Sequence, residues 1–360
     1  MSSNIFFLLS GEHNTLPAAE VLAILNSERC DHHEIKLSPK LLTLKANSEC
    51  MKAVMARAGM CEAAGRLIFQ CKDDSNEIMN TASDVSFSDF LEARESFSVR
   101  VYRVFGSSRH LDRMHLQSRI GDLILNSVPG STVELRNPKK EFIGMIGKGL
   151  FSLGRVAARR QDRNVGQRRP SERPALHPST MKPRLARCFV NLARARIGEV
   201  LLDPFCGVGG ILIEAGVMGC KAVGSDRDPR MVRKAMKNIR HFAIESGDVV
   251  VADARNSPYL KAPSIATDPP YGRGASTMGS GPSQLLREFL AESYSILPSD
   301  GFVCLAAPRD IGVQRLGLEA GLSVVESHLT RVHRSLVREI VVFSRSRAEH
   351  SERMSWNSYS

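Results

Sequence analysis

Short apolar runs and amphipathic stretches of helical period alternate regularly through the second half of the chain. The apolar runs predict strands and the amphipathic stretches predict helices. Strands are expected at 199–205, 221–226, 248–254, 264–270, 302–308, 322–330 and 338–343, and helices at 209–219, 229–242 and 284–297. This alternation predicts a doubly wound, mostly parallel α/β sheet with helices on both faces. Ligands of such sheets bind beyond the carboxyl ends of the strands.

The first half of the chain shows a mixed pattern that predicts an α+β region. Strands are expected at 6–10, 41–46 and 96–104 and on both sides of an Asn-Pro turn within 132–147, and helices at 17–26, 50–63 and 115–128. No basic residue precedes the apolar start at 5–9, so we expect a first strand there rather than a signal peptide. His32 and His33 are expected in a surface loop. This half indicates binding rather than catalysis.

The segment between the halves carries most of the net positive charge. The 360 residues have a formal net charge of +11, and residues 155–187 hold ten Lys or Arg against two acids. The part from 155 to about 179 is rich in Arg, Pro and Gln and lacks apolar periodicity, which indicates a connector. Clustered basic charge is typical of nucleic-acid binding. We therefore expect this connector, including Arg168 and Arg169, to contact phosphates.

The composition narrows the class of protein further. The eight cysteines show no CxxC pair and no Cys/His ligand spacing, so neither a metal site nor a disulfide framework is predicted. Scattered thiols fit a reduced, cytoplasmic protein. No apolar run approaches the ~20 residues needed to cross a membrane. We expect no membrane partner, and the sequence leaves both a monomer and an accessory subunit open.

The stretch DPFCGVGG at 203–210 follows the first strand of the second half and opens a helix. Its glycines permit a tight turn and a close approach of the backbone to a ligand. A dinucleotide fingerprint would require glycine at the position of Leu212, so NAD is disfavoured.

Acidic residues follow the first three strands of this half. Asp226 is placed to accept hydrogen bonds from ribose hydroxyls, Asp253 to reach an adenine amino group, and Asp203 to face an ammonium or a sulfonium. A cationic cofactor needs carboxylates rather than a phosphate cradle, and S-adenosylmethionine matches. A single Asp at a strand end is often only a cap, as we expect for Asp228 before Pro229. The predicted cofactor-binding set is Asp203, Phe205, Cys206, Gly207, Gly209, Asp226, Arg227, Asp253, Ala254 and Asp268.

The stretch ATDPPYGRG at 266–274 predicts a rigid corner, because two adjacent prolines remove two backbone donors and fix two φ angles. DPFCGVGG, GSD, VADA and DPPYG, in this order, resemble class I (Rossmann-like) S-adenosylmethionine-dependent methyltransferases that modify exocyclic amines. The resemblance implies a catalytic set in which Asp268 and the carbonyl of Pro269 accept the amine N–H groups, Pro270 holds that carbonyl, and Tyr271 stacks on a flipped base. The glycine-rich loop at 272–281 is expected to close over that base.

Two further stretches resemble the THUMP-domain tRNA guanosine-N2 methyltransferases of archaeal type. RPALHPSTMKPRLARCFVNLAR at 173–194 is similar to the segment that helps form the cofactor pocket in that family, and SFSVRVYR, the helix through Ile120-Gly121 and VELRNPKKEFIGMIG are similar to the latter part of a THUMP domain. The resemblance implies a tRNA partner, recognised by shape and phosphate contacts, and methylation of guanosine 10 on N2 with one methyl group or two. The implied domains are a ferredoxin-like subdomain at 1–50, a THUMP domain at 51–155, a basic linker at 156–178, the methyltransferase domain at 179–347 and a disordered tail at 348–360.

Other functions share parts of this pattern and stay open. A sister group with the same modules modifies guanosine 6 of tRNA, and DNA adenine-N6 methyltransferases use the same DPPY corner. Protein glutamine methyltransferases typically carry NPPY instead. A non-catalytic RNA-binding protein with a degenerate methyltransferase fold is the alternative from another class, and binding of S-adenosylmethionine separates it from the enzymes.

Overall fold

The computed structural model describes residues 2–104, 108–160, 162–178, 180–244, 247–270, 281–333 and 336–345. Tyr271, nearly all of the predicted loop at 272–281 and the predicted tail lie outside them. The chain forms two compact units whose division does not follow chain order. The first unit comprises Met1–Asn14, Cys30–Ala56 and Cys61–Gln161, and the second comprises Thr15–Arg29, Arg57–Met60 and Asp162–Ser360.

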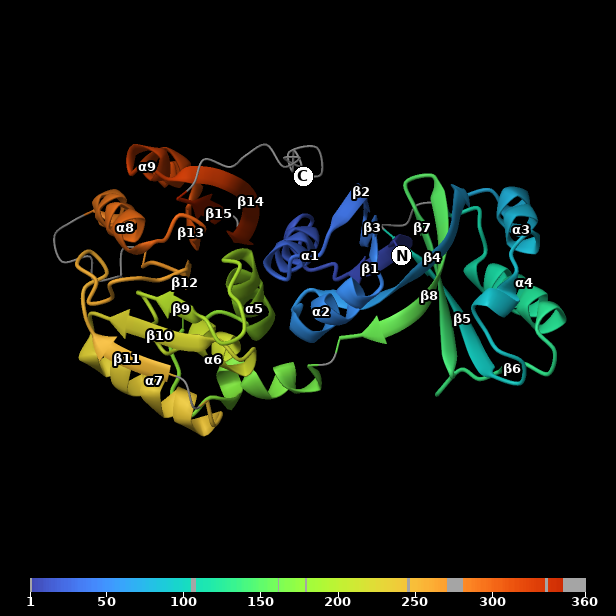
Figure 1. The fold of residues 1–360 in the computed structure, drawn as a ribbon, viewed down its shortest axis with the longest axis horizontal. Helices are drawn as coiled ribbons and strands as arrows, with labels where there is room; N and C mark the ends of the chain where they lie inside the picture. The colour runs from blue at the N-terminus through green and yellow to red at the C-terminus, as the bar shows by residue number, and fades with distance from the viewer. Residues whose placement is uncertain are drawn as a thin grey trace. The chain divides into compact units, whose positions relative to one another are not determined.

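The first unit is built on one eight-stranded sheet in the order β2-β3-β1-β4-β8-β7-β5-β6 (Figure 1). Its strands are β1 (Ser2–Leu9), β2 (His32–Ser38), β3 (Leu41–Asn47), β4 (Cys61–Lys72), β5 (Ser96–Arg103), β6 (Thr132–Val133), β7 (Lys140–Gly147) and β8 (Leu150–Arg159). The main helices are α2 (Glu49–Arg57), whose last residue belongs to the second unit, α3 (Ser75–Ser83) and α4 (Arg113–Ser127). Because β1 pairs with both β3 and β4, strands from the two sides of residue 50 share one sheet. The predicted domain boundaries within this region remain predictions.

Two expectations for the first 180 residues are wrong in detail. The helix expected at 50–63 ends at Arg57, because Cys61 already begins β4, which pairs with β1 and β8. His32 and His33 begin the edge strand β2 instead of forming a loop. The connector is more ordered than its composition suggests, since β8 runs to Arg159 and two 3-10 turns follow, η2 (Arg163–Arg168) and η3 (Pro170–Glu172).

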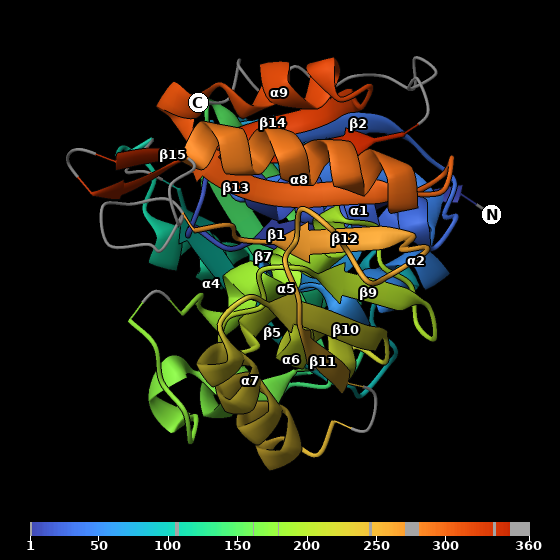
Figure 2. The same cartoon turned by 90° about the vertical axis from the view of Figure 1, so that its left-hand side faces the viewer.

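The second unit is built on a seven-stranded sheet in the order β11-β10-β9-β12-β13-β15-β14, which Figure 2 shows from β14 at the top to β11 at the bottom. Its strands are β9 (Val200–Asp203), β10 (Lys221–Asp226), β11 (Gly247–Val251), β12 (Ser264–Thr267), β13 (Phe302–Pro308), β14 (Ser323–His333) and β15 (Leu336–Ser344). Strands β9 to β13 pair with one another in parallel, and β15 is antiparallel to both β13 and β14. The doubly wound, mostly parallel sheet is therefore confirmed.

Helices cover both faces of this sheet because successive strand residues point to opposite faces. Leu201 of β9 and Cys304 of β13 belong to one buried cluster, whereas Leu202 and Val303 belong to the other. The helices of the unit are α1 (Leu16–Ser27), α5 (Pro183–Leu192), α6 (Gly210–Val217), α7 (Pro229–His241), α8 (Pro282–Ile296) and α9 (Val313–Glu319). Helices α1, α5, α6 and α7 supply the first cluster, and α8 and α9 supply the second. Among the helices described, none is both long and apolar enough to cross a membrane.

Helix α1 comes from the start of the chain and packs against α5 (Figure 1). Leu16, Ala19 and Ala23 of α1 are fully buried in the same cluster as Phe189 of α5. The segment Arg57–Met60 joins this arrangement: a Cβ at Gly59 would lie 2.8 Å from the carbonyl oxygen of Arg184, so only glycine fits. Two early segments thus complete one face of the second unit.

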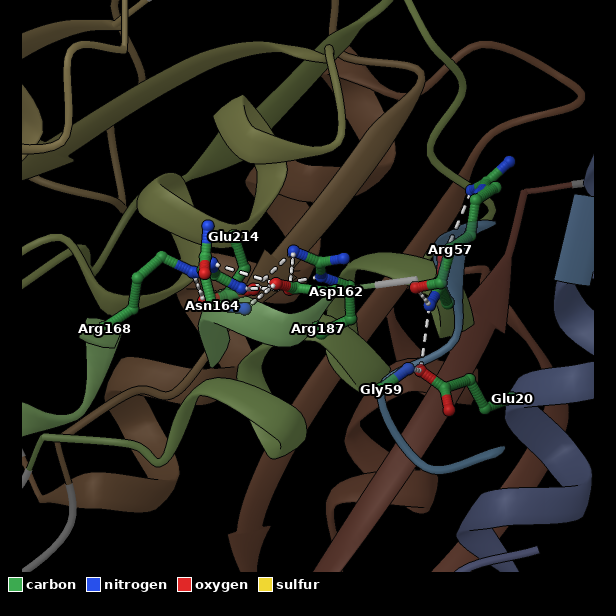
Figure 3. Close-up of polar contacts among 9 residues, drawn as sticks. Glu20, Arg57, Gly59, Asp162, Asn164, Arg168, Arg187 and Glu214 are labelled. Carbon is green, nitrogen blue, oxygen red and sulfur yellow. Dashed lines mark hydrogen bonds and ion pairs between the residues drawn. The ribbon is translucent and has the colours of Figure 1, made fainter. Parts of the chain in front are cut away.

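A buried carboxylate holds these segments together (Figure 3). Glu20 of α1 is fully buried and accepts hydrogen bonds from the backbone N–H groups of Gly59 at 2.8 Å and Met60 at 2.7 Å. The side-chain amide of Asn191 in α5 donates to the same carboxylate at 2.8 Å, and Arg57 donates to the amide oxygen of Asn191 at 3.3 Å. Burial raises the pKa of Glu20, and these hydrogen bonds oppose that shift. One acid therefore joins three separate stretches of chain.

We predict that Glu20→Gln lowers the free energy of unfolding of the second unit by about 1–3 kcal/mol, because an amide cannot accept from every donor that faces it and leaves a buried N–H unpaired. Urea denaturation followed by circular dichroism measures the change. Glu172→Gln, at an exposed acid of the same unit, is the matched control and is expected within about 0.5 kcal/mol of the parent. Equal midpoints for the two variants would contradict the role given to Glu20.

Candidate active site

The glycine turn after β9 has the left-handed backbone that a tight glycine turn allows. Gly207 and Gly209 have φ angles of +52° and +84°, where residues with a side chain are strained. A Cβ added at Gly207 would meet no atom within 4 Å, so this residue faces open space. Gly209 is the N-cap of α6. The turn leaves room for a ligand to approach the backbone closely.

The first predicted acid is buried at the end of β9. Asp203 accepts a hydrogen bond from Thr267 Oγ1 of β12 at 2.6 Å and from the backbone N–H of Phe205 at 3.2 Å. Burial raises the pKa of Asp203 to about 7, and the neighbouring charges of Asp226 and Asp268 raise it further. The ends of β9, β10 and β12 therefore bring three of the predicted acids into electrostatic contact.

The second acid, Asp226, supports the glycine turn directly. Its Oδ2 accepts from the backbone N–H of Gly207 at 3.0 Å, and its Oδ1 accepts from the N–H of Asp228 at 2.9 Å. Burial raises its pKa. A carboxylate oxygen has two lone pairs, so each oxygen can still accept from a ligand. Asp228 itself caps α7 ahead of Pro229, as predicted.

The third acid, Asp253, lies in a more open, cationic setting. Arg255 donates to both of its oxygens, at 3.0 and 2.7 Å, and Arg227 lies 3.7 Å away. The hydrogen bond from Arg255 lowers the pKa of Asp253. The ion pair with Arg227 links the end of β10 to the residues after β11. The remaining members of the predicted set flank these turns: Cys206 and Ala254 are buried, and Phe205 packs edge-on against Phe289 with ring centroids 5.2 Å apart.

The predicted catalytic corner follows β12. Asp268 is partly buried and forms an ion pair with Arg338 of β15. Burial raises the pKa of Asp268 to about 6, while the charge and hydrogen bond of Arg338 lower it. Pro269 is buried and Pro270 is exposed. Tyr271 lies outside the described residues, so its stacking role remains a prediction.

The segment that precedes the core is fastened to the glycine turn by one buried asparagine. The side chain of Asn238 in α7 accepts from the N–H of Ala175 and donates to its carbonyl, both at 2.9 Å, and donates to the carbonyl of Val208 at 2.9 Å. Every bond that one amide can readily form is used, and the side chain has no exposed surface. The segment resembling a cofactor-pocket element therefore lies against the turn that it was expected to adjoin.

The structure corrects the expectation for Arg168. This residue is 5% exposed, and its guanidinium binds Glu214 of α6 through Nε at 2.7 Å and Nη2 at 3.1 Å and also pairs with Asp162 (Figure 3). Arg187 of α5 donates a hydrogen bond from Nε to Glu214 at 2.9 Å and forms ion pairs through Nη2 with the same two acids, at 2.7 Å to Glu214 and 3.1 Å to Asp162. Arg168 therefore cannot contact phosphate, whereas Arg169 is exposed. The basic segment is anchored to the core by one arginine and exposes the next.

Sequence reasoning missed Thr267, Arg338 and the Glu214 cluster. Thr267 stood directly before the DPPY corner and carried a hydroxyl at the end of the short strand, which was a usable signal. Glu214 was also visible as a charge within the apolar helix ILIEA. Arg338 gave no local signal, because its partner is 70 residues away in the chain.

We predict that Arg168→Met lowers the free energy of unfolding of the second unit by about 3–5 kcal/mol, because it leaves the buried Glu214 and the partly buried Asp162 with fewer partners. Arg169→Met, one residue along, is the matched control and is expected to change it by less than about 0.5 kcal/mol. Urea midpoints report both values. A stable Arg168→Met protein would mean that Arg187 alone neutralises Glu214 and Asp162.

Comparison with known proteins agrees with this geometry. Residues 170–340 match the family model described as RMKL-like, methyltransferase domain, and residues 72–154 match the THUMP domain. The crystal structure of TrmN from Thermus thermophilus has a TM-score of 0.55 at 17% identity and covers 95% of this chain and 99% of its own, which shows the shared fold. The protein is therefore a THUMP-containing methyltransferase of class I fold.

Two curated relatives narrow the class to a family. The tRNA (guanine(10)-N2)-dimethyltransferase of Methanothermobacter thermautotrophicus is 36% identical over 340 residues, which span 94% of this chain and 98% of that protein. The protein of the same name from Pyrococcus abyssi is 30% identical over 289 residues, 79% of this chain and 84% of its own length. This chain belongs to the family of the archaeal tRNA (guanine(10)-N2)-dimethyltransferases.

Proposed function

We propose that this protein transfers methyl groups from S-adenosylmethionine to the exocyclic N2 of guanosine 10 in tRNA, adding two in succession. The observation that carries the proposal is the corner after β12, where Asp268 directly follows the strand, close to the buried Asp203 and the glycine turn. The relatives named for dimethylation at this position align over nearly the whole chain. The alternatives at guanosine 6 and at adenine in DNA receive no such support.

The residues present fit the cofactor. S-adenosylmethionine, when bound, supplies an electrophilic methyl group on a sulfonium. The open space above Gly207 admits a ligand next to the backbone, and Asp203 offers a buried carboxylate to a cationic group. Asp226, at the end of β10, is the acceptor proposed for ribose hydroxyls, and Asp253, after β11, is the one proposed for the adenine amino group. Phe205, Cys206, Arg227 and Ala254 are proposed to line the same site.

The chain's own contribution to the reaction is to prepare the amine. The N2 lone pair of guanine is delocalised into the ring, which makes it a poor nucleophile. Asp268 and the carbonyl of Pro269 are proposed to accept its two N–H bonds, so that the nitrogen pyramidalises and its lone pair is directed at the methyl carbon. The bound sulfonium would release the methyl group and leave as a thioether, and Asp268 would take up the proton that the nitrogen gives up when the N–C bond forms.

Binding of tRNA is proposed to involve exposed cations of both units. In the first unit, α4 exposes Arg113 and Arg119, and the turn before β7 exposes Arg136 and Lys139. In the second unit, Arg169 is exposed within the basic segment. Such residues fit recognition of RNA through phosphates and shape.

We also propose a cytoplasmic location, which the eight free cysteine thiols support.

The experiment that tests the proposal is methyl transfer from labelled S-adenosylmethionine to an unmodified tRNA transcript, with mass spectrometry of the nucleosides and mapping of the product. N2,N2-dimethylguanosine at position 10 is the expected result. Product at position 6 would assign the chain to the sister activity, and N6-methyladenine on DNA without any tRNA product would overturn the substrate. Calorimetry that detects no binding of S-adenosylmethionine at millimolar concentration would favour a non-catalytic RNA-binding protein.

We predict that Asp268→Ala lowers kcat by at least roughly 10²–10³-fold, since it removes a preorganised acceptor from the reacting amine. The affinity for tRNA, measured by filter binding, is expected to stay nearly unchanged. Asp300→Ala, at an exposed acid of the same unit, is the control and should keep full activity. Parallel loss of transfer and of tRNA binding in Asp268→Ala would refute the catalytic assignment.

We predict that Arg169→Met weakens tRNA binding and makes it less dependent on salt, because each phosphate contact releases a counterion. The slope of log K against log salt should fall by about 1. Affinities from 50 to 200 mM salt give the slope. An unchanged slope would show that Arg169 does not touch phosphate, and the same measurement on Arg136→Met would then test the first unit.

A further inference from the structure

Arg338 forms an ion pair with Asp268, and this arginine has no role in the methyl transfer proposed above. From β15 its Nη2 donates a hydrogen bond to Oδ1 of Asp268, and the two side chains are 12% and 23% exposed. The described residues place no hydrogen bond on Oδ2 of Asp268. One oxygen of the proposed catalytic carboxylate is therefore held by a partly buried cation, and the other remains available to a substrate.

The sheet explains how the arginine reaches this acid. Arg338 pairs with Pro308 at the carboxyl end of β13, and β13 lies between β15 and β12. Reaching from β15 to the end of β12 means crossing two strand spacings, about 10 Å. On the face shared with Ile340 of β15, the two residues of β13 that precede Pro308, Cys304 and Ala306, are small, and the larger Phe302 lies at the far end of the strand. The two small residues leave room for a long side chain to cross.

The surroundings of Asp268 make its ionisation depend on the charge of Arg338. Arg338 of β15 is the group that lowers its pKa against the effect of burial. Burial raises the pKa of Asp203 of β9 to about 7 and that of the Cys304 thiol of β13 well above its ordinary value, so neither group supplies a positive charge to Asp268. Without the guanidinium, burial would favour the protonated acid. A protonated carboxyl cannot receive the proton that the amine gives up.

We propose that Arg338 is a positioning residue for methyl transfer: it keeps Asp268 ionised and holds one carboxylate oxygen so that the other faces the amine. The proposal rests on the function proposed above. Arg338 acts through Asp268 and does not touch the substrate. Its removal should therefore affect kcat through the ionisation of Asp268 and leave binding of tRNA intact.

The test is the pH dependence of kcat on tRNA transcript at saturating S-adenosylmethionine, between pH 5 and 9, for the full chain. The parent should lose activity as the pH falls through about 6, because the carboxylate must be ionised. In Arg338→Met this acid limb should move up by about 1–3 pH units, the effect of losing an adjacent cation. Activity should then be depressed at pH 7 and largely recovered at pH 9, with KM for tRNA unchanged. Arg338→Lys, which keeps the charge, should lie between the two.

Other outcomes would distinguish this positioning role from a purely structural or a blocking role of Arg338. A loss of kcat that is equal at every pH, without rescue by Arg338→Lys, would overturn it in favour of a purely structural arginine. A kcat that rises with an unmoved limb would also overturn it and would show that Arg338 blocks the amine site. Arg331→Met, at an exposed arginine of β14, is the control and should leave the profile unchanged. A parent protein that transfers no methyl group to tRNA would refute the proposed function instead.

Discussion

The need to compensate buried carboxylates is the constraint on which the second unit depends. Desolvation makes each such charge costly unless donors surround it. Glu20 accepts hydrogen bonds from backbone N–H groups and from Asn191, and Glu214 accepts them from two arginines. Asp203 accepts one from Thr267, and Asp268 accepts one from Arg338. Every one of these partners comes from a different stretch of chain. The same physical demand therefore assembles the fold and aligns the site.

As a result, the two units alternate along the chain. Helix α1 and residues 57–60 belong to the second unit, although most of the intervening chain belongs to the first. The buried face that they cover is apolar, and Glu20 anchors them through bonds that cross more than 170 residues in the case of Asn191. Such non-local contacts form late and slowly in folding because loop closure must precede them. The second unit is consequently incomplete when taken as the chain from 162 onward.

The site combines a rigid glycine turn with two acids whose pKa values lie near neutrality. Asn238 and Asp226 fix the glycine turn through hydrogen bonds to backbone atoms. Asp203 and Asp268, in contrast, have pKa values raised toward neutrality by burial. Perturbed acids next to a fixed turn are typical of functional sites. The adjacent parallel strands β9 and β12 end at the same edge of the sheet, and this places Asp203 and Asp268 near each other.

The sequence by itself determined the alternation of strands and helices, the glycine turn, the strand-end acids and the DPPY corner, because periodicity and turn chemistry are local properties. It could not determine that the helix after residue 49 stops at Arg57, since strand pairing of Cys61 and the carboxylate of Glu20 decide that. It also misplaced Arg168, because the composition of a basic segment does not reveal which arginine meets a buried acid. Only the tertiary structure brought Arg338 to Asp268, since strand order and register set which residues meet across a sheet.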